Sequence, residues 1–334
     1  MSTLRIFNVS DYIHAGAAPR KSGYSPAYNG GVGEDCYGNY CARYLPTGGI
    51  AMALNPIYEI ITSDEDKDDI LVFCIDDTPT IKRRMYKELF NDETGYKGTR
   101  AAKNLDVTIQ REAIKDILSL VSPNVFFMEG YEADDIIATL VWKYSRSFDK
   151  VIVHTVDKDL FCLVSDNVEI APVGSRGNHV TKNNFSSIVT DKRKKPMPYN
   201  TILLDKLIHG DPSDNIPGIG TFYEEPIKKY INESKYKYIG NPSIFRTWVG
   251  NATNWDDRIV RTIDLIAPLY VEDEYLEISE ERININVLVR LGHLVKNKYC
   301  KVDYSTGDLP QVKEVLDFYT REYYDRGGRF NGRA

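Results

Sequence analysis

The sequence predicts an α/β fold with a mostly parallel central sheet flanked by helices, followed by a mainly helical C-terminal part. Two observations support this class. Short apolar runs alternate with helix-periodic segments over the first 170 residues, and such strand-like runs fade after about residue 200. With 334 residues and 42% hydrophobic content, the chain is long enough for one large domain or two smaller ones.

Five apolar runs have the length and continuity of strands that are buried on both faces of a parallel sheet. They are residues 4–9, 70–75, 124–128 and 150–156, with 168–173 as a weaker fifth. Three segments between them repeat apolar residues every three or four positions, which predicts helices at 48–62, 108–121 and 132–145. Strand and helix therefore alternate, as in a parallel α/β sheet.

Two regions do not follow this alternation. Residues 15–49 contain eight glycines and five tyrosines without periodicity, which predicts a long irregular loop. Beyond residue 200, helices are predicted at 201–209, 222–231, 258–270 and 284–296. We therefore divide the chain into an α/β domain at 1–204 and a helical region at 205–334.

Composition excludes several classes of protein. No apolar run reaches the eighteen or so residues that cross a bilayer, and the first residues lack a secretory signal, so a cytoplasmic protein is expected. The net charge of −6 argues against a protein that coats nucleic acid, but residues 82–103 carry seven basic residues against three acids. The cysteines are scattered without CxxC spacing, which predicts reduced thiols rather than disulfides or a zinc site. They are Cys36, Cys41, Cys74, Cys162 and Cys300.

Acidic residues follow three of the predicted strands or open the helix after a strand. They are Asp76, Glu132, Asp134, Asp135, Asp157 and Asp159. Because ligands of open α/β sheets bind at the carboxyl ends of the strands, we expect these side chains to converge. Asp211 and Asp214, three residues apart, could close the same site from the second half of the chain.

Each acidic motif by itself is also explained as a solvated first helical turn, a helix cap or a hydrogen-bonded loop. Converging carboxylates, however, raise one another's pKa, and a divalent cation relieves the repulsion. Oxygen ligands without nearby His or Cys favour Mg²⁺ or Mn²⁺ over zinc. Two such ions can clamp the attacking and leaving oxygens of a phosphodiester displacement.

The motifs YEADDIIATLV, VDKDLFCLVSDNV and GDPSDNIPGIG, in this order, resemble those of the 5′-nuclease (flap endonuclease) superfamily. A fourth stretch, LVFCIDDTPTIKRRMYKEL followed by GYKGTR, resembles its strand, acidic residue and basic arch. The superfamily includes the 5′-nuclease domain of bacterial DNA polymerase I and the ribonucleases H of tailed bacteriophages, and the chain most resembles the latter. The resemblance covers about residues 4–220. It implies a PIN-like 5′-nuclease fold, an arch at about 80–107 and a helix–three-turn–helix motif in a DNA-binding C-terminal region.

The resemblance also implies roles for single residues. Asp76, Glu132, Asp134, Asp135, Asp157, Asp159, Asp211 and Asp214 match metal-binding acids. Lys97 and Arg100 match basic residues that contact the scissile phosphate. Arg83, Arg84 and Tyr86 match the arch entrance that grips or stacks on a single strand, although an ordinary exposed helix explains them as well.

The sequence departs from the superfamily pattern in two places. Asn8 stands where the first strand usually ends in a metal-binding Asp, so one ion should bind more weakly unless Asp11 compensates. The glycine-rich hairpin is short, but Gly218 and Gly220 can let backbone N–H groups approach a duplex phosphate. A K⁺ ion at this motif is a further expectation.

These features together predict a Mg²⁺-dependent 5′-3′ nuclease with two ions, for which Mn²⁺ can substitute. Its expected substrates are RNA–DNA hybrids, flaps and duplex 5′ ends during DNA replication, including RNA primers. We expect a monomer in the cytoplasm, or in the host cytoplasm if the protein is viral, with a single-strand-binding protein or a clamp as further partners. Two alternatives are a catalytically weakened branched-DNA-binding protein of this fold and a single-strand ribonuclease, which the arch disfavours.

Overall fold

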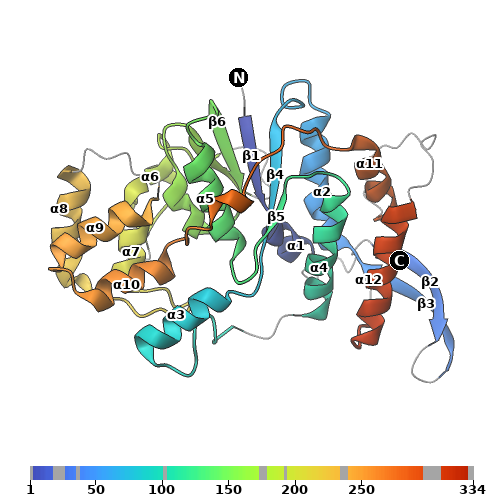
Figure 1. The fold of residues 1–334 in the computed structure, drawn as a ribbon, viewed down its shortest axis with the longest axis horizontal. Coiled ribbons are helices and arrows are strands. Elements are labelled where there is room, and N and C mark those ends of the chain that lie inside the picture. The colour runs from blue at the N-terminus through green and yellow to red at the C-terminus, as the bar shows by residue number, and fades with distance from the viewer. Residues whose placement is uncertain are drawn as a thin grey trace. The chain divides into compact units, whose positions relative to one another are not determined.

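The computed structural model describes residues 3–17, 27–34, 38–100, 104–172, 179–191, 194–233, 240–295 and 310–329. Five strands form one sheet in the order β5-β4-β1-β6-β7 (Figure 1). They are β1 (Thr3–Asn8), β4 (Ile70–Ile75), β5 (Val125–Phe127), β6 (Lys150–His154) and β7 (Val168–Ala171). The predicted α/β class and all five predicted strands are confirmed.

The chain folds into two compact units, each built from separate stretches of sequence. The first unit contains residues 1–8, 76–101 and 126–277, and the second contains 9–75, 102–125 and 278–334. Apart from Asp11, every residue predicted for the site lies in the first unit. The functional division at residue 204 stays a prediction.

In the first unit, β1 pairs in parallel with β6, and β6 pairs in parallel with β7. The register runs from Thr3 opposite Lys150 to Phe7 opposite His154. Side chains of both faces are buried, as the continuous apolar runs predict. The strands therefore end at one edge, where Asn8 and the residues after His154 begin the site.

The helices of the first unit confirm the predicted helical second half. They are α3 (Thr80–Phe90), α5 (Ala133–Tyr144), α6 (Phe185–Ile188), α7 (Ile202–His209), α8 (Glu224–Glu233), α9 (Pro242–Ala252) and α10 (Asp257–Ile266). Short 3-10 turns are η1 (Lys158–Leu163), η2 (Tyr199–Thr201), η3 (Thr221–Tyr223) and η4 (Asp273–Tyr275). Helix α9 was not predicted. Its start is fixed by the Asn241 side chain, which accepts hydrogen bonds from the N–H groups of Ser243 and Ile244.

In the second unit, β2 (Ala27–Glu34) and β3 (Tyr40–Pro46) form an antiparallel pair. The helices of this unit are α1 (Val9–Ala17), α2 (Gly48–Ile61), α4 (Leu105–Ser119), α11 (Ile285–Leu294) and α12 (Pro310–Asp325). The predictions for α2 and α4 are confirmed, with ends shifted by up to three residues. The 284–296 prediction is confirmed through α11, and its last residue lies outside the described part.

The prediction of a long irregular loop at 15–49 is wrong for the described residues, which form the end of α1, the β2–β3 hairpin and the start of α2. The hairpin depends on contacts that are distant in sequence. The Tyr28 hydroxyl donates to Asp317 at 2.6 Å, and the Tyr44 N–H donates to the Tyr324 hydroxyl at 3.0 Å. Residues 18–26 and 35–37 lie outside the described residues.

Two predictions from composition can be compared with the structure. Cys41, Cys74 and Cys162 are free thiols, whereas Cys36 and Cys300 lie outside the described residues. Among the described helices, none combines the length and apolar character that crossing a membrane requires.

His154 ends β6 in an apolar setting, with its ring stacked on Phe7 at 4.2 Å between centroids. Burial, with smaller contributions from Arg5 and His179, lowers the His154 pKa to about 3. The folded state therefore binds fewer protons than the unfolded state between this value and the unfolded pKa of about 6.5. Stability is present above pH 6.5 and is lost as pH falls toward 3.

We expect wild-type protein to lose about 2 kcal/mol of unfolding free energy at this site between pH 7 and pH 5. His154→Phe should remove that share of the pH dependence, measured by urea unfolding at both pH values. The exposed His293→Phe is the matched control. An unchanged pH dependence in His154→Phe would contradict the assignment.

Candidate metal centre and active site

The start of α5 carries a pair of acids that also hold the helix in place. Glu132 is the N-cap, and its N–H donates to Asp135 Oδ2 at 3.0 Å in a capping box. Asp76, directly after β4, accepts from the Ala133 N–H at 2.8 Å. The first turn of α5 is therefore tied to the residue that follows a sheet strand.

Asp134 lies in the middle of a group of like charges. Burial raises its pKa well above the ordinary value, and neighbouring acids raise it further. These acids are Asp157, Asp76, Glu132 and Asp159. The predicted convergence of acids from different strand ends is thus present in the structure.

Asn8, at the end of β1, belongs to the same place. Its Nδ2 donates to Asp134 Oδ1 at 3.2 Å. Its Oδ1 is buried and has no hydrogen-bond partner in the described structure. We call Asn8, Asp76, Asp134 and Asp157 the Asp134 group. An orphaned carbonyl oxygen beside carboxylates is a donor set that suits a hard cation.

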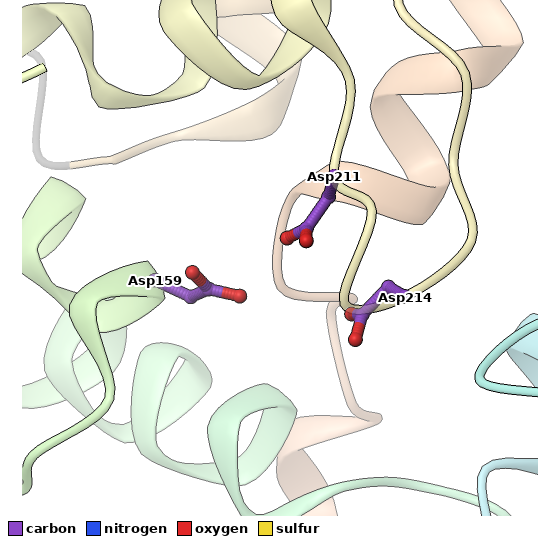
Figure 2. A group of neighbouring side chains, drawn as sticks. All are labelled: Asp159, Asp211 and Asp214. Carbon is purple, nitrogen blue, oxygen red and sulfur yellow. The ribbon is translucent and has the colours of Figure 1, made fainter. Parts of the chain in front are cut away.

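A second cluster, the Asp211 group, consists of Asp159, Asp211 and Asp214 (Figure 2). One carboxylate oxygen from each lies within 4.8 Å of the others. Asp159 lies in η1. The N-cap of η1 is Asp157, whose side chain accepts a hydrogen bond from the Asp159 N–H at 2.9 Å. Asp211 and Asp214 come from a tight turn closed by Asp211 N–H to Ile216 O at 2.8 Å.

Lys206 from α7 lies against the Asp211 group. Its Nζ is 2.9 Å from Asp211 Oδ2 and also forms an ion pair with Asp159. Burial alone raises the Asp211 pKa, but Lys206 and a hydrogen bond from Ser213 outweigh this and lower it to about 2. Asp211 therefore stays ionised because the protein supplies a counter-ion.

Glu132 and Asp135 are neutralised by a buried lysine of α3. Lys82, which is 5% exposed, places Nζ 3.0 Å from Asp135 Oδ1 and 3.6 Å from Glu132 Oε2. Although burial by itself lowers the Lys82 pKa, the two acids raise it above its ordinary value. Burial raises the Glu132 pKa, and Lys82 with Lys97 overcomes this and lowers it to about 2.

The segment after α3 brings two predicted basic residues to the acids. Lys97 forms an ion pair with Glu132 and lies 3.8 Å from Asp214 Oδ2. Arg100 Nη2 lies 2.5 Å from Asp214 Oδ1. Between them, the buried Tyr96 hydroxyl lies 2.9 Å from Glu132 Oε2 and 3.0 Å from Asp214 Oδ2. Lys97 and Arg100 thus both contact the acidic residues of the site.

Asn215 ties this segment to the acidic turn. It adopts a left-handed φ of 63°, and its amide donates to the Tyr86 hydroxyl, to Asp92 and to Gly95 O. The Lys97 N–H donates to Asp214 O at 3.1 Å. The position of Lys97 over the acids is therefore fixed through the backbone as well as through charge.

Two predicted residues lie in places that do not suit the expected roles. Asp135 is 1% exposed, and its oxygens accept from Lys82, Glu132 N–H and, at 2.7 Å, Leu269 N–H, so it supports the site rather than facing it. Tyr86 is 2% exposed with a hydrogen-bonded hydroxyl. Its ring cannot stack on a nucleic-acid strand while it is packed there, so the stacking prediction is corrected.

The remaining predicted residues differ in how they suit nucleic-acid contact. Arg83 and Arg84 are exposed on α3. The Gly220 N–H already donates to Ile208 O at 3.0 Å, so the predicted phosphate contact through this group is corrected. A Cβ at Gly218 would meet Ile208 O at 2.4 Å, which explains glycine there by close packing. Asp11 lies in α1 of the second unit, and its role as a substitute ligand stays a prediction.

Sequence reasoning missed Lys82, Tyr96 and Lys206, which neutralise or bridge the acids. Part of this was readable in advance, because Lys206 lies in the predicted helix at 201–209, which ends just before Asp211, and Tyr96 directly precedes Lys97. A cavity of about 390 Å³ also lies beside the base of the arch. It is lined by Arg83, Lys87, Asn91, Asp92, Glu93, Thr94, Gly95, Tyr96 and Gly98.

Comparison with known proteins agrees with this geometry. Residues 40–191 match the family described as 5′-3′ exonuclease, N-terminal resolvase-like domain. This segment is therefore similar to the N-terminal domains of 5′-3′ exonucleases. The resemblance to the 5′-nuclease superfamily is thereby confirmed, while the match covers less than half of the chain.

Relatives at the sequence level carry names of the same kind. The 5′-3′ exonuclease of Aquifex aeolicus (strain VF5) is 29% identical over 248 residues, which are 73% of this chain and 78% of that protein. DNA polymerase I of Mycobacterium tuberculosis (strain ATCC 25618 / H37Rv) is 31% identical over 159 residues, or 47% of this chain. The match spans only 17% of that polymerase.

Solved structures show the same fold. The bacteriophage T5 D15 protein co-crystallised with metal ions aligns with a TM-score of 0.50 at 14% identity, covering 97% of this chain and 98% of that one. The T5 5′-exonuclease with bound divalent zinc gives the same values. At this identity the likeness establishes the PIN-like nuclease fold and no more.

Lys82→Met should destabilise the protein by about 3–5 kcal/mol, because it leaves the buried Asp135 carboxylate without its lysine partner and Glu132 with Lys97 alone. Urea unfolding would measure the loss. Lys87→Met, on the exposed side of the same helix, is the control and should change stability by about 0.5 kcal/mol or less. Equal unfolding midpoints for the two variants would show that Lys82 does not neutralise the site.

Proposed function

We propose that the chain is a divalent-metal-dependent 5′-nuclease that hydrolyses phosphodiesters of RNA–DNA hybrids, flaps or duplex 5′ ends during DNA replication, including RNA primers. One observation carries this proposal. Acids from several strand ends and from the 211–214 turn converge, and two basic residues of the arch segment lie on the same acids.

The donor set fits the proposed metal. The Asp134 group and the Asp211 group offer oxygen atoms alone, and the buried Asn8 Oδ1 lacks a partner among described residues. Oxygen donors of this kind suit Mg²⁺, with Mn²⁺ as a substitute. When bound, such ions neutralise the carboxylates and make the phosphodiester more susceptible to attack by water.

The chain's own residues would then hold and orient the substrate. Lys97 and Arg100, which pair with Glu132 and Asp214, can extend the same N–H groups to a phosphate and stabilise the negative charge that develops on it. The exposed Arg83 and Lys87 line the cavity at the arch base, where they can attract a single strand. The K⁺ ion, replication partners, monomeric state and cytoplasmic location remain parts of the proposal.

Asp157→Ala should lower turnover of a 5′-flap substrate in Mg²⁺ by at least about 100-fold, because it removes a charged ligand from the Asp134 group. Gel-based cleavage with a flap and an RNA–DNA hybrid would measure this, with folding checked by circular dichroism. The exposed Asp64→Ala is the control. Unchanged cleavage by Asp157→Ala would refute the proposed centre.

The alternative is a weakened or inactive protein that binds branched DNA, and Asn8 favours it because an amide adds no negative charge beside Asp134. Asn8→Asp distinguishes the two. It should lower the stability of metal-free protein, because two carboxylates then meet, and it should lower the Mg²⁺ concentration needed for half-maximal cleavage. The alternative would be identified if the wild-type protein binds flaps without cleaving them and only the Asn8→Asp variant cleaves them.

A further inference from the structure

We propose that Asn215 is a positioning residue for the nuclease reaction, because its side-chain amide holds residues 92–100, the segment after α3, so that Lys97 stays beside Glu132. The inference rests on the proposed function and adds to it a residue that acts through Lys97. We call residues 92–100 the Lys97 segment. Asn215 follows Asp214 in the acidic turn, and its amide nitrogen donates to that segment.

The Lys97 segment runs along the acidic turn in the opposite direction. Three hydrogen bonds of 3.1–3.2 Å pair its residues 95, 97 and 100 with residues 215, 214 and 213 in turn. They join Asn215 Nδ2 to Gly95 O, Lys97 N to Asp214 O, and Arg100 Nε to Ser213 O. In the first of these bonds the turn contributes a side chain, so a substitution in the turn can remove it.

The same amide also reaches α3 and the start of the Lys97 segment. Its nitrogen lies 3.0 Å from Tyr86 Oη and 3.2 Å from Asp92 Oδ2. The Tyr86 hydroxyl lies 2.8 Å from the Asn215 carbonyl oxygen, and Tyr86 is 2% exposed. Because Asp92 Oδ2 and Gly95 O only accept hydrogen bonds, residue 215 has to supply a donor. An amide does this, whereas a carboxylate does not.

The backbone at Lys97 adopts a conformation that depends on its surroundings. Lys97 has a left-handed φ of 57°, which is unfavourable for a residue with a side chain and persists where neighbouring groups hold it. Gly95, two residues earlier, also has a positive φ of 73°. Its carbonyl oxygen accepts both the Gly98 N–H at 3.1 Å and the Asn215 amide. Asn215 therefore holds the turn from which Lys97 projects.

The position of the Lys97 ammonium makes this support relevant to the rate of reaction. Lys97 Nζ forms an ion pair with Glu132 and lies 3.8 Å from Asp214 Oδ2, and its side chain is 15% exposed. In the proposed reaction this ammonium stabilises the charge that develops on the phosphate. Because a misplacement of about 1 Å can cost roughly 100-fold in rate, loss of the Asn215 amide should slow the chemical step.

Asn215→Gly removes the amide and tolerates the left-handed φ of 63°. In steady-state cleavage of a 5′-flap with Mg²⁺, it should lower kcat by about 10- to 100-fold and change KM by no more than about twofold. The same substitution made in Lys97→Ala should cause little further loss, because the two residues act as one unit. The exposed Asn254→Gly, at a φ of 54°, is the matched control and should keep the wild-type kcat. A raised KM with unchanged kcat, or additive losses in the double variant, would overturn the inference.

An exchange of two side chains tests the donor itself and covers the case in which Asn215→Gly does not fold. Asn215→Asp places a second carboxylate against Asp92 and removes the donor to Gly95 O. Adding Asp92→Asn returns an N–H donor between the two positions and leaves an oxygen for the Thr94 N–H, which is 2.9 Å away in the wild type. The double variant should recover at least about tenfold of the kcat lost in Asn215→Asp. No recovery would contradict the positioning role.

Chemical labelling separates this inference from the proposed function. In metal-free protein, acylation of the Lys97 amine, read by mass spectrometry after digestion, should rise several-fold in Asn215→Gly and stay unchanged in Asn254→Gly. Equal labelling of both variants would refute the role of Asn215 while leaving the nuclease proposal intact. If labelling rises but the wild-type protein cleaves no flap, the contact between Asn215 and the Lys97 segment is upheld and the proposed function fails.

Discussion

Repulsion between carboxylates is the constraint on which the rest of this site depends. The fold gathers acids from the ends of separate strands into a region where burial weakens solvation, so burial and the neighbouring charges raise the pKa of Asp134. Two lysines with largely buried side chains reduce this repulsion by pairing with the acids. Lys82 serves the acids at the start of α5, and Lys206 serves Asp159 and Asp211.

Several of these acids also build the local structure that holds them. Glu132 and Asp135 form the capping box of α5, Asp157 caps η1, and Asp211 accepts from the Ser213 N–H at 3.0 Å within its turn. The residues that cap these elements are therefore also the proposed metal ligands or their neighbours. This coincidence explains why each motif alone was equally well explained as a cap or a loop, and why only their convergence in space distinguishes a site.

The sequence was sufficient for features set by local pattern. The strands and α5 follow from continuous apolar runs and three- or four-residue periodicity, and the ends of the strands located the acids. It was insufficient where a side chain's role depends on distant partners. The β2–β3 hairpin is held by hydrogen bonds to residues of α12 that lie 289 and 280 positions away in sequence, so its glycine-rich segment resembled a loop. Tyr86 was misassigned because its burial depends on Asn215, which no local pattern reveals.

Asp135 is a further residue whose role could not be predicted from local sequence, because its partners are distant in the chain. Spacing alone places it on the helix face of Glu132, as a ligand would be, but Lys82 and the Leu269 N–H occupy its oxygens. A carboxylate whose spacing predicts a metal ligand thus stabilises the site through an ion pair and hydrogen bonds. A lysine that pairs with a carboxylate also lowers the attraction of that carboxylate for a metal ion, so Lys82 and Lys206 oppose cation binding at the oxygens they contact.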